Sequence, residues 1–412
     1  MNIAIIGGGN LGLSMADELS KYYCNIKIFE AASKIGGLAS TFKVKWGNKT
    51  YNFPSTYRHF ELSKVNSKII DSLKLNNKTV YKIPTGGLLY DGHDIKHGFM
   101  GIPLLLLQKN IPLSTKIKAS LLLLQNFRPG IKPVKLGYFK GGHETFMQKL
   151  EKKLLKNNLI ILKNTNIQKI DFTEKEITYK KNNKQHKEKF GMIISTISPD
   201  KIASLAEGSL PSEISGPLRK IKYGHVTTLC VGLNIGLKSP YLQHIRDKSY
   251  PFSELFNSTM LTDLPANKSF LYVVSYDTKL HNLKEKEITD LFKKHLERFF
   301  KSDIKKHIAW TKLFKHKTWR TSPVIISVPM LSEKLINYKG NYIIYHDFKQ
   351  GVFMNFKRTL GNFSKSTPKL QTILGLTPYP QDVGAFGLLS YPGYLMSKQI
   401  ARVNHLIKKR MF

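Results

Sequence analysis

The first thirty residues constrain the fold more than any other stretch of this chain. A short apolar run, Ile3–Ile6, leads directly into a glycine-rich turn, Gly7-Gly8-Gly9-Asn10-Leu11-Gly12. Apolar residues at helical spacing follow, and a second apolar run, Ile26–Phe29, ends on the acidic Glu30. This order predicts a strand, a tight turn, a helix and a second strand, which is the arrangement of a dinucleotide-binding unit.

Each part of the turn has a separate role in binding a dinucleotide. Gly7 permits the tight turn, Gly9 removes a side chain so that backbone N–H groups can approach a pyrophosphate, and Gly12 lets the helix pack closely on the strand. The start of the helix, at Asn10 and Leu11, faces the phosphates with a partial positive charge. We therefore predict these residues as part of a cofactor site.

Glu30 lies about 20 residues after the turn, where a carboxylate accepts hydrogen bonds from a ribose 2′-hydroxyl and repels a 2′-phosphate. A glycine-rich turn that binds no nucleotide is the alternative, and a lone glycine triplet would not exclude it. The strand, helix, second strand and acid agree here, so the sequence favours a nucleotide site.

Length and cysteine content set further limits. A chain of 412 residues is too long for one compact core, which predicts two domains or one domain with large insertions. Cys24 and Cys230 lie in apolar runs without metal-ligand partners nearby, so we expect no disulfide framework and no metal site. We find no secretory signal pattern and no apolar run near the roughly 20 residues that span a bilayer. We expect a cytoplasmic protein.

The net charge of +37 results from 65 Lys and Arg residues against 28 Asp and Glu residues. Such an excess attracts an anionic membrane, a nucleic acid or a phosphorylated substrate. No nucleic-acid-binding motif accompanies the charge, so we expect no nucleic acid as a partner. Lysine-rich solvated faces are the favoured interpretation, and peripheral contact with the anionic inner face of a membrane is the alternative.

The residues after Glu30 resemble a known family. A short spacer leads to Gly36-Gly37-Leu38, an alternating run around Gly47-Asn48 predicts a β-hairpin, and the segment ends in Tyr57-Arg58-His59-Phe60. This order resembles the FAD-dependent amine oxidase superfamily, which includes protoporphyrinogen oxidase, phytoene desaturase and, more distantly, UDP-galactopyranose mutase. The resemblance implies FAD as the cofactor, with Gly36, Gly37 and Leu38 close to its pyrophosphate and ribityl chain.

The resemblance also implies cofactor contacts further along the chain. It puts Pro54–Phe60 near the isoalloxazine ring, Ile167 at an adenine contact and Thr196 near the cofactor at the end of a buried strand. Two segments compete for the final FAD contact: the strand-like run Asn341–Asp347, and Asp382-Val383-Gly384, which precedes a predicted helix. We prefer Asp382 and Gly384, because that helix would point its N-terminus at a phosphate.

Periodicity predicts several other elements. Glu285–Phe300 has the spacing of an amphipathic helix. Tyr81–Ile83 with Gly86–Gly92 predicts a second hairpin, and Leu159–Leu162 with Ile167–Ile170 resembles a strand pair of the family. The apolar stretch Ile102–Phe127 predicts helices, either buried in a substrate domain or in contact with a membrane or an apolar substrate.

These patterns predict an α/β fold, in which a Rossmann-like FAD-binding domain carries an inserted α+β substrate domain with an antiparallel sheet. The predicted FAD-binding segments are residues 1–75, 140–205 and 336–412. The predicted substrate-domain segments are residues 76–139 and 206–335.

The family resemblance implies catalysis by a flavin, for which a protein supplies mainly orientation, electrostatics and exclusion of water. We predict Tyr57, Arg58 and His59 as the catalytic residues, because Arg58 or His59 beside the ring could stabilise its negative charge or hold an anionic substrate. Loop residues that pair only with backbone are the alternative.

The predicted function is that of an FAD-dependent oxidoreductase, which removes hydride from a hydrophobic or amine-bearing small molecule. A mutase-like flavoenzyme that acts on a nucleotide sugar without net redox change is one alternative. In that case basic residues would bind the diphosphate. A degenerate relative that binds without catalysis is the other alternative.

Overall fold

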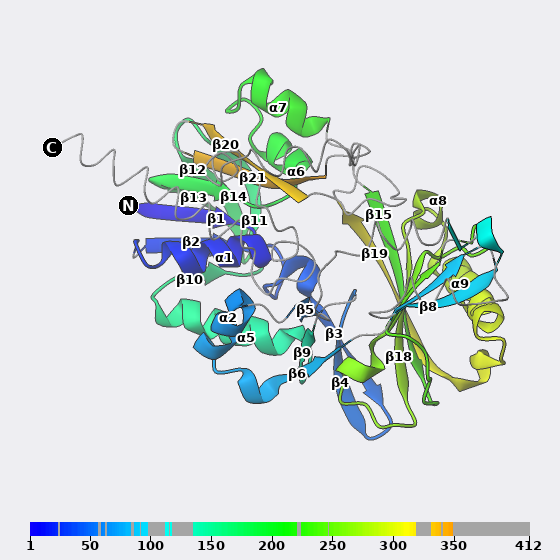
Figure 1. Ribbon diagram of the computed structural model, residues 1–412. Helices are drawn as coiled ribbons and strands as arrows, with labels where there is room; N and C mark the ends of the chain where they lie inside the picture. The colour runs from blue at the N-terminus through cyan, green and yellow to red at the C-terminus, as the bar shows by residue number, and fades with distance from the viewer. Residues whose placement is uncertain are drawn as a thin grey trace, which may run out of the picture.

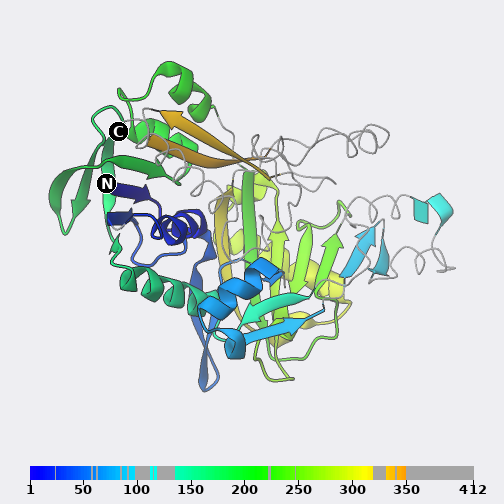
Figure 2. The same cartoon turned by 60° about the vertical axis from the view of Figure 1, so that its left-hand side comes forward.

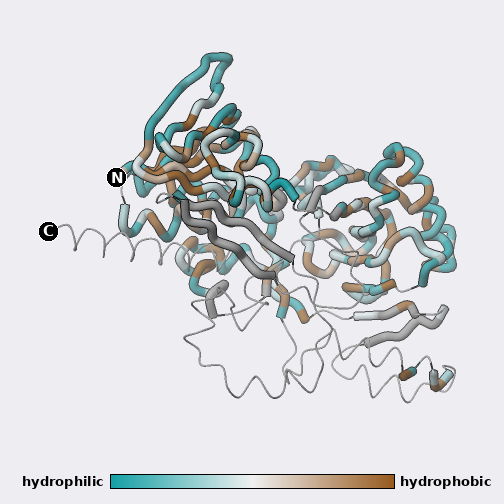
Figure 3. The backbone as a smooth tube through the Cα atoms, turned by 90° about the horizontal axis from the view of Figure 1, so that it is seen from above, coloured by the Kyte–Doolittle hydropathy of each residue, from teal (hydrophilic) through white to brown (hydrophobic). Residues whose placement is uncertain are grey.

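Figure 1 shows the computed structural model, which describes residues 1–23, 25–56, 59–61, 64–83, 86–90, 92–97, 112–114, 116–117, 135–220, 224–245, 247–318, 331–338 and 341–348. Two large sheets lie side by side, one at the left and one at the right of both Figure 1 and Figure 2. In Figure 3 the apolar brown segments gather within these two regions. The predicted fold class is confirmed.

The left-hand sheet has six strands and holds the N-terminal strand near its centre. Its order is β10 (Ile160–Leu162), β2 (Asn25–Phe29), β1 (Asn2–Ile6), β14 (Met192–Ser195), β21 (Asn341–Phe348) and β20 (Leu331–Tyr338). Neighbouring strands are parallel except for β20, which is antiparallel to β21. Its central strands are continuous apolar runs because parallel sheets are covered on both faces.

Two cores flank the six-stranded sheet. Ile3 and Ile5 of β1 point to one core, and Ala4 and Ile6 point to the other, as the alternation of a strand requires. The first core is completed by α1 (Asn10–Leu19), α2 (Lys64–Ser72) and α5 (His143–Lys156). The second is completed by β11 (Asn166–Asp171), β12 (Glu176–Lys181), α6 (Pro199–Leu205) and α7 (Ser212–Arg219), and by Phe190, which follows the exposed strand β13 (Lys184–Lys189).

The right-hand sheet has seven strands and is mainly antiparallel. Its order is β19 (Ile308–Thr318), β15 (Gly224–Leu233), β18 (Ser269–Ser275), β17 (Glu254–Asn257), β16 (Leu242–Ile245), β7 (Gly86–Tyr90) and β8 (His93–His97). Among the strand pairs of this sheet in the described residues, only β16 and β7 are parallel.

The two faces of this sheet bury different partners. One face packs against α9 (Glu285–Phe300), which lies at the far right of Figure 1. The opposite face packs against the hairpin of β3 (Thr41–Trp46) and β4 (Lys49–Pro54), and against β9 (Leu136–Phe139). We call this second face the aromatic face, and its strand residues include Val226, Phe256, Phe270, Tyr272 and Val274.

Shorter elements join these layers. They are β5 (Phe60–Glu61), β6 (Thr79–Lys82), α8 (Thr278–His281) and four 3-10 helices, Gly37–Ala39, Asn76–Lys78, Ser258–Leu261 and Ile304–His307. β9 pairs with both β5 and β6. No helix in the described ranges is long and apolar enough to cross a membrane.

The predicted opening βαβ unit, the hairpin around Gly47-Asn48 and the helix Glu285–Phe300 are confirmed. Most of the apolar stretch Ile102–Phe127 lies outside the described residues. The boundaries of the five predicted domain segments stay a prediction.

Two predicted strand pairings are wrong. β7 forms its hairpin with β8, whereas Tyr81 belongs to β6, which pairs with β9. β10 lies beside β2 in the six-stranded sheet, whereas Ile167 belongs to β11, which pairs with β12. Both predictions paired strands that are neighbours in sequence. In the second case, hydrogen bonds to Glu30 direct the chain away from β10 before β11 begins. The Glu30 N–H donates to Leu162 O at 2.8 Å, and the Thr165 N–H donates to Glu30 O at 3.0 Å.

Replacing Phe292 by alanine tests how α9 is held on the sheet. Phe292 is fully buried and packs edge-on against Phe252, with ring centroids 5.6 Å apart. We expect F292A to lower the free energy of unfolding by about 3–5 kcal/mol, because it deletes a large core side chain and leaves a cavity. Urea unfolding measures the change, with the exposed Lys294→Ala on the same helix as the control. A loss as small as that of K294A would contradict this packing.

Candidate flavin-binding site

The carboxyl ends of β1, β2 and β14 meet at one edge of the six-stranded sheet. The chain passes from β1 through α1 to β2 on one side, while β14 lies on the other side of β1. The strand order therefore reverses at β1, which is where open α/β sheets bind ligands. Gly7, Glu30 and Thr196 follow these three strands directly.

The glycine turn after β1 leaves room for a ligand on one side only. Gly7 has φ of +106°, which other residues rarely adopt. A Cβ at Gly12 would lie 2.0 Å from the Gly7 carbonyl oxygen, so α1 packs directly on the turn. A Cβ at Gly9 would meet no atom within 4 Å, so this residue faces open space.

The first turn of α1 provides hydrogen-bond donors at that open space. The first N–H groups of a helix have no intrahelical acceptor. The residue before the helix is Gly9, which supplies no side-chain cap, and no acidic residue lies in the first turn. The Oδ1 of Asn10 is buried and has no hydrogen-bond partner among the described residues. The N–H donors at Asn10 and Leu11 fit the oxygens of a pyrophosphate in this open space. The unpaired Oδ1 of Asn10 could accept a hydrogen bond from a hydroxyl of the same ligand.

Glu30 lies against the same turn. Its Oε2 accepts a hydrogen bond from the Gly8 N–H at 2.8 Å, and its Oε1 accepts one from the Ala32 N–H at 2.8 Å. A carboxylate has about four acceptor positions, so positions remain for ribose hydroxyls. A Cβ at Gly8 would lie 2.9 Å from Glu30 Oε2. The sequence analysis assigned no role to Gly8. Its position between Gly7 and Gly9 could have indicated that it also belongs to the site.

A second pair of glycines lies against the first. Gly36 and Gly37 have φ of +119° and +54°. The Gly36 N–H donates to the Gly8 carbonyl at 2.7 Å, and a Cβ at Gly37 would lie 3.3 Å from the Cα of Gly9. The chain is therefore brought to the edge of the open space beside Gly9. Leu38 lies in the 3-10 helix that follows, and its side chain lies outside the described set.

Thr196 and Ile167 occupy different environments. The Thr196 hydroxyl donates to the Ile6 carbonyl at 2.8 Å, which fixes the end of β14 beside the glycine turn. The Ile167 side chain is 7% exposed and belongs to the core that contains Phe29 and Tyr179. Only the backbone of Ile167 is thus left for a cofactor contact.

Of the predicted catalytic residues, the structure describes His59. The ring is buried, and its Nδ1 is hydrogen-bonded to the Tyr241 hydroxyl. The nearby carbonyl of Pro54 accepts a hydrogen bond from Tyr272 at 3.0 Å. The segment predicted to lie near the flavin ring is therefore attached to the aromatic face. Tyr57 and Arg58 lie outside the described residues.

Of the two segments that compete for the final FAD contact, the structure describes only the first, which is β21. β21 lies parallel to β14, with Tyr342 opposite Ile194 and Ile343 opposite Ser195. The rest of β21 therefore continues beyond β14 at the carboxyl edge of the sheet. Asp382 and Gly384 lie outside the described residues. The preference for them stays a prediction.

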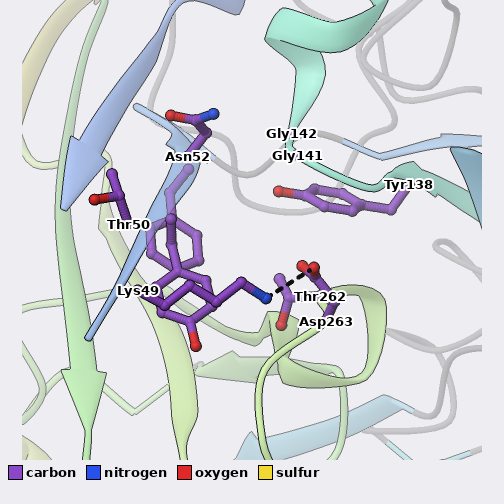
Figure 4. Close-up of a pocket in the computed structure, with 10 residues that line it drawn as sticks. Lys49, Thr50, Asn52, Tyr138, Gly141, Gly142, Thr262 and Asp263 are labelled. Carbon is purple, nitrogen blue, oxygen red and sulfur yellow. Dashed lines mark ion pairs between the residues drawn. The ribbon is translucent and has the colours of Figure 1, made fainter. Parts of the chain in front are cut away.

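A separate hollow lies beside the β3–β4 hairpin and is drawn in Figure 4. It has a volume of about 130 Å³ and is lined by Lys49, Thr50, Tyr51, Asn52, Phe53, Tyr138, Gly141, Gly142, Thr262 and Asp263. At its rim Lys49 Nζ lies 3.5 Å from Asp263 Oδ2. Burial, together with the charge of Asp263, raises the pKa of Tyr138 well above its usual range. None of the lining residues belongs to the glycine turn, so this hollow is distinct from the candidate flavin site.

Metal and thiol chemistry receive no support from the described ranges. No three His, Cys, Asp or Glu residues are grouped there so that they could hold a metal ion. Cys230 is a free, buried thiol whose pKa is raised by burial. Cys24 lies outside the described residues.

Replacing Gly9 by alanine tests the open space beside the turn. Gly9 has φ of −78°, which alanine adopts easily, so we expect a change in stability below about 1 kcal/mol. The added methyl group enters the predicted cofactor space, and we expect FAD affinity to fall about tenfold or more. Titration of the cofactor-free protein with FAD measures the affinity, and thermal unfolding measures the stability.

The control for this variant is Gly216→Ala in α7, where an added Cβ also meets no atom within 4 Å. We expect G216A to bind FAD as the unmodified protein does. Equal FAD affinity in G9A would show that the cofactor does not approach this face of the turn.

Comparisons with solved structures confirm the fold. A protein provisionally named protoporphyrinogen oxidase, from Exiguobacterium sp. 255-15, superposes with a TM-score of 0.64 at 12% identity over 98% of each chain. A putrescine oxidase variant gives 0.59 at 12% identity over 98% of each chain. A reduced UDP-galactopyranose mutase gives 0.60 at 14% identity over 79% of this chain and 83% of its own. No curated protein sequence matches.

Two family descriptions match the sequence itself. The NAD(P)-binding Rossmann-like domain matches residues 5–73, which contain the glycine turn and Glu30. The family of flavin-containing amine oxidoreductases matches residues 114–332, more than half of the 412 residues. The predicted resemblance is confirmed: the chain belongs to the flavin-containing amine oxidoreductase family, and its cofactor is FAD.

Proposed function

We propose that this protein is an FAD-dependent oxidoreductase that removes a hydride from an apolar or amine-bearing small molecule. The observation that carries the proposal is the attachment of the segment Pro54–Phe60 to the aromatic face. Tyr272 and Tyr241 make that attachment through hydrogen bonds to Pro54 and His59. The family resemblance puts the same segment beside the flavin ring. A substrate at the ring would then lie beside the apolar core that the aromatic face forms with the hairpin.

The surroundings of this segment suit an apolar substrate. Phe256, Tyr272 and Val274 of the aromatic face are almost completely buried against the hairpin and β9, so the segment lies beside an apolar core. Removing an apolar substrate from water is favourable by roughly 25 cal/mol for each Å² of apolar surface buried. Exclusion of water also protects a reduced cofactor from side reactions.

Bound FAD supplies a two-electron acceptor, so the substrate needs only to lose a hydride and a proton. The residues of this chain provide binding and positioning. The glycine turn and Glu30 would hold the dinucleotide, and Tyr272 fixes the backbone of the ring segment. We propose that Arg58 or His59 stabilises negative charge on the reduced ring, as predicted from the sequence.

Anaerobic mixing tests the proposal. We expect the oxidised holoprotein to lose its visible flavin absorption when mixed with primary alkylamines or with apolar compounds that have an activated C–H bond. Reoxidation by dioxygen or a quinone should restore the absorption. The control is photochemical reduction, which shows that the flavin can be reduced.

The mutase-like alternative gives a different result. Such an enzyme would interconvert the two ring forms of a UDP-sugar only after chemical reduction of its flavin, and no amine or apolar compound would bleach it. That pattern, with photoreducible flavin, would contradict the proposed oxidoreductase. A flavin that no substrate class affects in either state would favour the non-catalytic relative.

A further inference from the structure

The hollow beside the β3–β4 hairpin has the size and the lining of a site for a small polar molecule. Its volume is about 130 Å³. An apolar cavity of about 150 Å³ in another protein binds benzene, so this hollow admits a molecule of roughly six non-hydrogen atoms. Tyr51 and Phe53 line it with aromatic rings, whereas Lys49, Asn52 and Tyr138 line it with polar groups.

The Tyr138 hydroxyl is a hydrogen-bond donor without an acceptor. The side chain is only 6% exposed, and Figure 4 shows its hydroxyl pointing into the hollow. Within the described part of the chain it forms no hydrogen bond. Burial and the charge of Asp263 raise the pKa of this hydroxyl, so it keeps its proton at neutral pH. An acceptor in the hollow would recover the free energy that an unpaired hydroxyl costs.

Two further donors line the same hollow. Asn52 Oδ1 is buried without a partner among the described residues, and Figure 4 shows the amide nitrogen on the other side, toward Tyr138. Lys49 Nζ lies 5.1 Å from the centroid of the Tyr51 ring. The nitrogen is also 3.5 Å from Asp263 Oδ2, which is too long for a strong N–H···O bond, so its donors remain usable.

The start of α5 adds a partial positive charge to this wall. Gly142 lines the hollow, directly precedes the 14-residue helix and supplies no side-chain cap. Helix N-termini favour anions. Glu144 in the first turn is neutralised by Lys34, which donates to its carboxylate at 2.8 Å. Among the ten lining residues the only acid is Asp263, whose side chain is 50% exposed at the rim.

We propose that this hollow binds a short-chain monocarboxylate. Its carboxylate would accept hydrogen bonds from Tyr138, Asn52 and Lys49, because donors to a charged acceptor form the stronger hydrogen bonds. Its short alkyl chain would lie along the rings of Tyr51 and Phe53. A single negative charge matches the single ammonium group, whereas a doubly charged phosphate would be repelled by Asp263. The site does not depend on the proposed oxidoreductase function.

Titration of the FAD-loaded protein with propionate, followed by ligand-observed NMR, tests this assignment. Propionamide has nearly the same shape without the charge, and inorganic phosphate has a higher charge, so these two are the comparison probes. We expect a Kd of about 1 mM for propionate, a reasonable affinity for so small a ligand. We expect both comparison probes to bind at least about tenfold more weakly.

Two variants should change the affinity for propionate in opposite directions. Tyr138→Phe removes a donor, so we expect about tenfold weaker binding, with stability unchanged or higher because the lost hydroxyl is unpaired. Asp263→Asn removes the repelling charge, so we expect about threefold tighter binding. The control is Tyr250→Phe, whose ring packs beside His295 of α9 outside the hollow, and it should bind propionate as the unmodified protein does.

Several results would overturn the assignment. They are an affinity for propionate that Y138F leaves unchanged, weaker binding in D263N, equal binding of propionamide, and no saturable binding to the unmodified protein. If Y138F unfolds at a lower temperature or loses FAD, Lys49→Gln takes its place. This exposed position tolerates the change, and we expect about fivefold weaker binding of propionate. Unchanged binding in K49Q would contradict the site.

Discussion

The contact between α1 and the turn after β1 is the constraint on which the cofactor site depends. Because any side chain at Gly12 would collide with the Gly7 carbonyl, only glycine lets the helix begin so close to the strand. This approach aims the first N–H groups of α1 at the open space beside Gly9. The turn then supplies the Gly8 N–H to Glu30 and the Gly8 carbonyl to Gly36. Three separate segments are thus assembled around one backbone turn.

The β3–β4 hairpin couples this turn to the seven-stranded sheet and lies between the two sheets in Figure 1. At its start, the Thr41 hydroxyl donates to Glu144 at 2.9 Å, and Lys34 donates to the same carboxylate at 2.8 Å. Partial burial raises the pKa of Glu144, but these two hydrogen bonds, together with the charges of Lys34 and Lys43, outweigh that effect and lower it overall. At the other end of β3, the Trp46 indole N–H donates to Asn234 at 2.8 Å. The hairpin therefore links α5 with the end of β15.

Local sequence was sufficient to predict the elements whose formation depends on residues close together in the chain. The glycine turn, the first hairpin and α9 each follow from patterns within about 30 residues, since turn chemistry and periodicity act at that range. The pairing of β6 with β9 and of β10 with β2 joins distant segments, so adjacency in sequence gave the wrong partners. The bond between Tyr241 and His59 spans 182 positions.

The most direct test of the account is the visible absorption spectrum of the purified protein, followed by chromatography of any cofactor that heat releases. The open space at Gly9 and the free acceptor positions of Glu30 fit a dinucleotide, and membership of the family makes this dinucleotide a flavin. We expect the absorption bands of an oxidised or reduced flavin and the release of FAD. A colourless protein that takes up no added FAD would contradict the central claim.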